Sequence, residues 1–132
     1  MNSFSIKTSA RFEMKDITGQ IRDIIRDTGT GSGLCHVFVP HTTAAVTINE
    51  NADPDVPIDI ITILDRLIPL HGSYRHREGN SAAHVKASLL GASETVLIEN
   101  GQPLLGTWQS IFFCEFDGPR TRRVLVKVVA DP

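Results

Sequence analysis

The sequence predicts a single domain of the α+β class with a largely antiparallel sheet. Its 132 residues, 41% of them hydrophobic, are enough for one buried core without covalent cross-links. Helical spacing of apolar residues is confined to the first 90 residues, whereas the last third alternates β-prone runs with hairpin turns. No internal repeat or linker divides residues 1–132, so one domain is expected.

The N-terminal third combines one predicted strand with one predicted helix. Apolar and polar residues alternate from Phe4 towards Met14, which is typical of a strand. Asp16 then offers a helix cap, and the isoleucines that follow it recur at helical spacing. The glycine-rich run at 29–33 follows this helix instead of opening one, so a plain loop is favoured over a phosphate cradle.

The rest of the chain adds two predicted helices and most of the predicted sheet. Helices are predicted at 55–70 and 82–90, and strands at 34–39, 44–48, 94–99, 104–116 and 123–129. The first of these helices is heavily apolar, which predicts that it lies mostly in the core. Trp108, the only tryptophan, is predicted to anchor the core as well.

Composition excludes several classes of function. A formal net charge of -2 gives no positive field for nucleic acid or for an acidic membrane surface. No apolar run approaches the ~18 residues that cross a bilayer, and no signal peptide is recognised, so a cytoplasmic protein is expected. Cys35 and Cys114 lie in apolar runs, where buried reduced thiols are commoner than a disulfide.

Three histidines stand in dense polar clusters that folding alone does not require. His41 lies at a turn after an apolar strand, His76 in a polar loop and His84 near the start of a helix. Imidazoles in such places bind metals, move protons or hold anions. The three are therefore predicted to be catalytic and to bind a divalent metal, zinc or magnesium. Chance proximity and a bound anion are the alternatives that the spacing leaves open.

Neighbouring polar residues complete the candidate site. Glu50 ends an apolar strand, so its carboxylate is a candidate proton acceptor in catalysis. Lys86, near a helix start, and Arg122, on a basic strand, are candidate phosphate ligands, with a solvated surface charge as the alternative for both. The residues predicted to bind substrate are Thr43, Asn51, Asn80, Lys86, Gly106, Thr107, Gln109 and Arg122.

Several segments occur in the order typical of one known family. They are His41-Thr42-Thr43-Ala44-Ala45, Glu50-Asn51-Ala52-Asp53, the stretch from His76 to Lys86, Leu105-Gly106-Thr107-Trp108-Gln109, and the basic run from Arg120 to Arg123. Through these segments the chain resembles the YjbQ-like family of secondary thiamine-phosphate synthases. The resemblance covers nearly the whole chain, and the ordered set is more specific than any one motif.

The resemblance implies one YjbQ-like domain over 1–132, a β-sandwich-like sheet with a few flanking helices, and a homotrimer with sites near subunit boundaries. It also implies an activity, secondary for many members, that joins a pyrimidine diphosphate to a thiazole phosphate and releases diphosphate. The predicted function is thus a small cytosolic enzyme acting on phosphorylated small molecules. The alternative is a trimeric binding protein that holds a phosphorylated metabolite or a metal without turnover.

Overall fold

The computed structural model describes residues 1–132 as eight strands and three helices. The helices are α1 (Thr18–Thr28), α2 (Asp55–Leu67) and α3 (Ser81–Leu90). The strands are β1 (Asn2–Lys7), β2 (Glu13–Asp16), β3 (Gly33–Phe38), β4 (Ala44–Glu50), β5 (Ser93–Glu99), β6 (Gln102–Pro103), β7 (Gln109–Glu115) and β8 (Thr121–Ala130). This content confirms the predicted α+β class.

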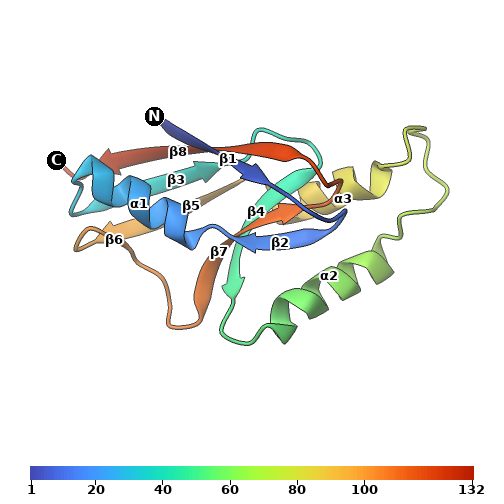
Figure 1. Ribbon diagram of the computed structural model, residues 1–132, viewed down its shortest axis with the longest axis horizontal. Coiled ribbons are helices and arrows are strands. Elements are labelled where there is room, and N and C mark those ends of the chain that lie inside the picture. The colour runs from blue at the N-terminus through green and yellow to red at the C-terminus, as the bar shows by residue number, and fades with distance from the viewer.

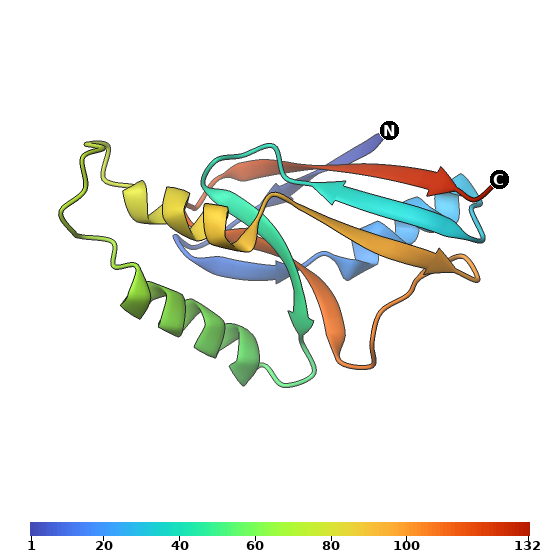
Figure 2. The same ribbon diagram turned by 180° about the vertical axis from the view of Figure 1, so that it is seen from behind.

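The strands form two curled antiparallel sheets (Figure 1). One sheet has five strands in the order β1-β8-β3-β5-β6, and the other has three in the order β2-β7-β4. α1 and α3 lie on opposite sides of the sheets, and α2 projects from the end of the molecule at which α3 lies (Figures 1 and 2). Both chain termini lie at the other end.

The main core lies between α1 and the inner face of the five-stranded sheet. Ile21 and Ile25 of α1 are fully buried, and the alternation along β3 turns Cys35 and Val37 towards them. Both cysteines are free, as predicted. Burial raises the pKa of Cys35 to about 11 and that of Cys114 to about 12, so both thiols stay protonated at neutral pH.

The outer face of the five-stranded sheet carries an uncovered apolar row. Leu34 of β3 lies between Leu97 of β5 and Val129 of β8 in the strand register. Their exposed fractions are 43%, 55% and 50%. Adjacent large apolar side chains on a sheet face usually meet another surface, and nothing within this chain covers these three.

Two predicted strands are interrupted, which corrects the sequence interpretation. The run from Phe4 towards Met14 divides into β1, which pairs with β8, and β2, which pairs with β7 in the other sheet. The chain passes from the first sheet to the second after Thr8, whose N–H still donates to the Arg120 carbonyl beside β8 at 2.9 Å. The run at 104–116 is likewise broken by a turn in which the Gln109 N–H donates to the Gly106 carbonyl at 3.1 Å.

Two predictions of core burial are wrong. α2 contains no buried residue, and Ile58, Ile63 and Leu67 on it are all more than half exposed. Trp108 is 62% exposed in the loop before β7. An apolar side chain in a sequence does not reveal which part of the protein covers it, and within one chain little covers the apolar side chains of α2 or Trp108.

None of the three helices is long and apolar enough to cross a membrane.

Candidate functional site

Two adjoining cavities lie beside the start of β4, and His41, Thr42 and His84 line both of them. One, of about 470 Å³, we call the polar lobe; it is lined further by Thr43, Glu78, Asn80, Asp117, Arg120 and Arg122. The other, of about 460 Å³, we call the small-residue lobe; it is lined further by Ala44, Ala87, Ser88, Gly91 and Ala92. Two of the three predicted histidines therefore share one site.

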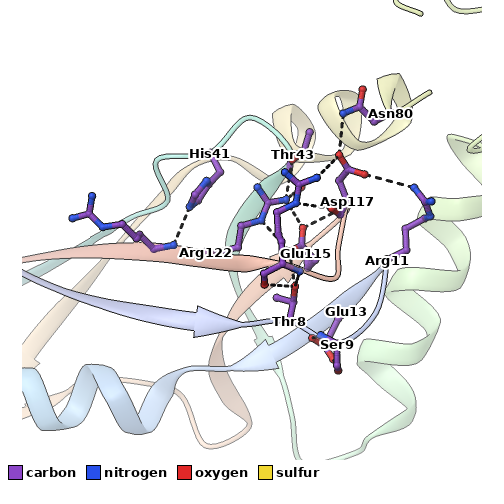
Figure 3. A network of polar contacts seen from close by, with 12 residues as sticks. Thr8, Ser9, Arg11, Glu13, His41, Thr43, Asn80, Glu115, Asp117 and Arg122 are labelled. Atoms are coloured by element: carbon purple, nitrogen blue, oxygen red, sulfur yellow. Dashed lines mark hydrogen bonds and ion pairs between the residues drawn. The ribbon is translucent and has the colours of Figure 1, made fainter. Parts of the chain in front are cut away.

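A buried ion pair joins Arg122, which lines the polar lobe, to Glu115 behind it (Figure 3). Arg122 on β8 is 3% exposed, and Glu115 on β7 is fully buried. Arg122 Nε donates to Glu115 Oε1 at 2.9 Å, while Nη2 donates to Glu115 Oε2 and, at 2.8 Å, to Thr43 Oγ1. Nη1 makes no hydrogen bond within the chain, so its two N–H groups remain for a ligand in the lobe that Arg122 lines.

Glu115 is held as a carboxylate that fixes this arginine. Its two oxygens also accept the Thr8 hydroxyl at 2.8 Å and the Asp117 N–H at 3.0 Å. Burial alone raises the pKa of Glu115, but the hydrogen bonds from Arg122, Asp117 and Thr8 outweigh it and hold the pKa below its ordinary value. Sequence reasoning missed Glu115, because its partner Arg122 lies across a turn on the next strand.

Asp117 makes polar contacts with three segments of the chain around the polar lobe (Figure 3). It accepts hydrogen bonds from Asn80 Nδ2 at 2.9 Å and Arg120 Nη2 at 3.0 Å, and Arg11 Nη1 lies 3.6 Å away. Asn80, which precedes α3, is thereby tied to the turn between β7 and β8. Its Oδ1 is buried without a partner, although buried acceptors are almost always paired. Asn80, which is predicted to bind substrate, therefore lies in the wall of the polar lobe.

The hydrogen bonding of His41 defines its tautomer. Its Nε2 accepts the backbone N–H of Arg123 at 2.9 Å, so in the neutral ring Nδ1 carries the proton. Burial and the nearby positive charge of Arg122 lower the pKa of His41, and its bond from Arg123 does not reverse this. His41 is therefore a neutral imidazole whose remaining polar atom is a donor.

His84 and His76 form an imidazole pair. Their ring centroids are 5.3 Å apart, and the rings meet edge to face at 85°. His76 Nδ1 lies 3.1 Å from Ser81 Oγ, and its Nε2 lies 3.8 Å from a Glu78 carboxylate oxygen. Neither nitrogen of His84 has a hydrogen-bond partner within the chain. His84 is thus the imidazole of the site with both nitrogens available to a ligand.

The predicted three-histidine metal centre does not fit these side chains. No three His, Cys, Asp or Glu side chains of the chain are grouped so that they could hold a metal ion. The lone pair of His41 Nε2 is used by Arg123, and its Nδ1 is protonated, so a metal would have to displace that hydrogen bond. Within one chain the imidazoles are better suited to direct contact with a ligand.

Five predicted site residues lie at the other end of the β4–β7 ladder. Ala44 pairs with Glu115 beside the cavities, whereas Glu50 pairs with Gln109. Six residues of extended strand separate these pairs by about 20 Å. The structure therefore does not bring the following residues to the cavities within one chain: Glu50, Asn51, Gly106, Thr107 and Gln109.

Lys86 is placed differently from the sequence prediction. Its ammonium forms an ion pair with Asp65 of α2 and lies 3.8 Å above the ring centroid of Phe12, and the residue is 1% exposed. It lines neither lobe. A lysine near a helix start suggested a phosphate ligand, but its long side chain runs inwards and fastens α2 to α3.

Solved structures share this fold. A crystal structure of a YjbQ/UPF0047-family protein from Clostridium acetobutylicum matches with a TM-score of 0.96 and 52% identity, covering 98% of this chain and 100% of that one. A structure from Sulfolobus solfataricus, described as a YbjQ-like protein of unknown function, matches with a TM-score of 0.94 and 34% identity, covering 98% and 96%.

Sequence comparison gives the same relationship. UPF0047 protein YugU of Bacillus subtilis is 51% identical over 130 residues, which are 98% of each chain. A UPF0047 protein of Methanocaldococcus jannaschii is 53% identical over 128 residues, covering 97% of this chain and 93% of the relative. The family described as UPF0047 protein YjbQ-like matches residues 2–131. The chain therefore belongs to the YjbQ-like UPF0047 family.

Proposed function

We propose that the chain is an enzyme that binds phosphorylated small molecules in the polar lobe and joins a pyrimidine diphosphate to a thiazole phosphate. The observation that carries the proposal is Arg122, a buried guanidinium that lines the lobe, is fixed by Glu115 and makes no hydrogen bond through Nη1. A fixed arginine with free N–H groups is well suited to phosphate oxygens. Arg120 and the Nδ1–H of His41 add donors to the same lobe.

The proposed reaction forms one carbon–nitrogen bond and breaks one carbon–oxygen bond. The lone pair of the thiazole nitrogen attacks the carbon that bears the diphosphate, and the electrons of the broken bond leave with the diphosphate. Negative charge therefore grows on the leaving oxygen, and donors already aimed at it lower the barrier. In this proposal Arg122 and His41 donate to the diphosphate, and His84 transfers a proton to it.

We also propose a homotrimer in which a neighbouring copy completes the site. Leu34, Leu97 and Val129 leave an apolar row uncovered, and α2 exposes several large apolar side chains. Head-to-tail association about a threefold axis forms a closed ring. Such a ring can place the end of one copy that carries Glu50 and Gln109 beside the cavities of the next, which is how the two groups of predicted residues would meet.

A binding protein without turnover is the second candidate. It is favoured by the charge balance of the polar lobe, because Arg122 is paired with Glu115 and Arg120 with Asp117. Arginines that are already neutralised hold a ground-state anion, but they give less additional stabilisation to a leaving group that gains charge.

The test is an assay of purified protein with both precursors, run with and without divalent metal. Thiamine phosphate measured by mass spectrometry should accumulate with the wild type and not with a variant in which His41, His76 and His84 are all replaced by alanine. Saturable binding of the precursors without product would support the binding protein instead. If the folded wild type neither binds the precursors nor forms product, both candidates are wrong.

A further inference from the structure

We propose that the small-residue lobe is a separate subsite for a flat, uncharged ring, in a ligand whose anionic group occupies the polar lobe. The inference rests on the proposed anion site and names the ligand class more closely. The two lobes meet at His41, Thr42 and His84, which line both. A ligand that spans them therefore has the link between its ring and its phosphate beside the two imidazoles.

The walls of the two lobes differ in chemistry. The polar lobe is lined by polar and charged side chains together with Pro40. Apart from the three shared residues, the small-residue lobe is lined by three alanines, a glycine and a serine. A charged or strongly polar group therefore finds partners in one lobe, while an apolar face loses little in the other.

Apart from the three shared residues, the wall of the small-residue lobe contains three hydrogen-bonding groups that are already used. The Ser88 hydroxyl donates to the His84 carbonyl one helical turn earlier at 2.9 Å. The carbonyl of Gly91 accepts the Val46 N–H at 3.2 Å, and that of Ala92 accepts the Val39 N–H at 2.8 Å. With these groups satisfied, the wall favours contact with a ring face over hydrogen bonds to ring substituents.

The small-residue lobe is large enough for a ring. Its volume is about 460 Å³, about three times that of a dry cavity of roughly 150 Å³ that accepts benzene. The lobe stays open because the side chains around it are small. Ser88 and Ala92 stand exposed at its edge, so a larger side chain at either position would fill it without disturbing the core.

The experiment replaces Ser88 with leucine and measures the binding of two probes, inorganic phosphate and phenyl phosphate, by calorimetry. The wild type should bind phenyl phosphate at least about tenfold more tightly than inorganic phosphate. Ser88→Leu should remove most of that difference and leave the affinity for inorganic phosphate within about twofold. Ala92→Leu serves as a second variant, and Gln20→Leu on α1, also at an exposed helical position, is the matched control.

Each result bears on a different claim. If the wild type binds both probes equally, or if Ser88→Leu and Ala92→Leu both weaken the two probes equally, the ring subsite is wrong while the anion site stands. If neither probe binds the folded wild type, the anion site and the ring subsite fail together. Selective loss of phenyl phosphate affinity in the lobe variants, and not in Gln20→Leu, is the result that the inference requires.

Discussion

Glu115→Ala is expected to lower the free energy of unfolding by about 3–5 kcal/mol, because it leaves the Arg122 guanidinium buried without its counter-charge. Arg122 is 3% exposed, so solvent screens the loss of its counter-charge only weakly. Chemical denaturation at pH 7 measures the loss. Glu115→Gln keeps the shape and one acceptor oxygen, so its loss should be smaller. A loss below about 1 kcal/mol for the alanine variant would show that the pair does not hold the site together.

The same carboxylate predicts a pH dependence of stability. Because hydrogen bonds hold the pKa of Glu115 below its ordinary value, the folded state binds this proton less readily than the unfolded chain does. Its stabilisation is therefore fully present above the unfolded pKa of about 4.3 and is lost as the pH falls through the lower folded pKa. The difference in stability between wild type and Glu115→Gln should shrink over that acidic range and stay constant above it.

His84→Asn is expected to reduce turnover by roughly 100-fold or more while leaving precursor affinity within about twofold. The reason is that neither nitrogen of His84 has a hydrogen-bond partner within the chain, whereas Nε2 of His41 accepts the Arg123 N–H. Initial rates and calorimetric binding constants separate the two effects. His71→Asn is the matched control, because His71 is exposed in the segment after α2 and lines neither lobe. Equal rates for wild type and His84→Asn would exclude the proposed proton transfer.

Local patterns identified most elements, but not the places where the chain changes sheet. The isoleucines of α1 predicted that helix because their spacing matches its buried face. The division between β1 and β2 was missed since both halves alternate in the same way. The crossing is set by Thr8, whose hydroxyl bonds lead to Glu115 and Arg120 more than 100 residues away. No window of local sequence contains that information.

The candidate site could be predicted only in part, for a similar reason. His41 and His84 were found because each stands among polar residues, and α3 packing on β4 brings them together. Glu115 was missed because its ion-pair partner lies across a turn on the next strand. Lys86 was wrongly predicted to bind phosphate because Asp65, its ion-pair partner, lies on α2 and not beside it in the sequence. Burial of α2 was overestimated because an apolar side chain in a sequence does not reveal whether its own chain covers it.

The most direct test of the central claim is a calorimetric titration of inorganic diphosphate into wild type and Arg122→Lys at pH 7, with circular dichroism to confirm that both are folded. Lysine keeps the positive charge but lacks the planar fork that binds Glu115 and a phosphate at the same time. The anion site predicts saturable binding by the wild type and a loss of affinity of about tenfold or more in Arg122→Lys. Equal affinities, or no binding by the folded wild type, would contradict it.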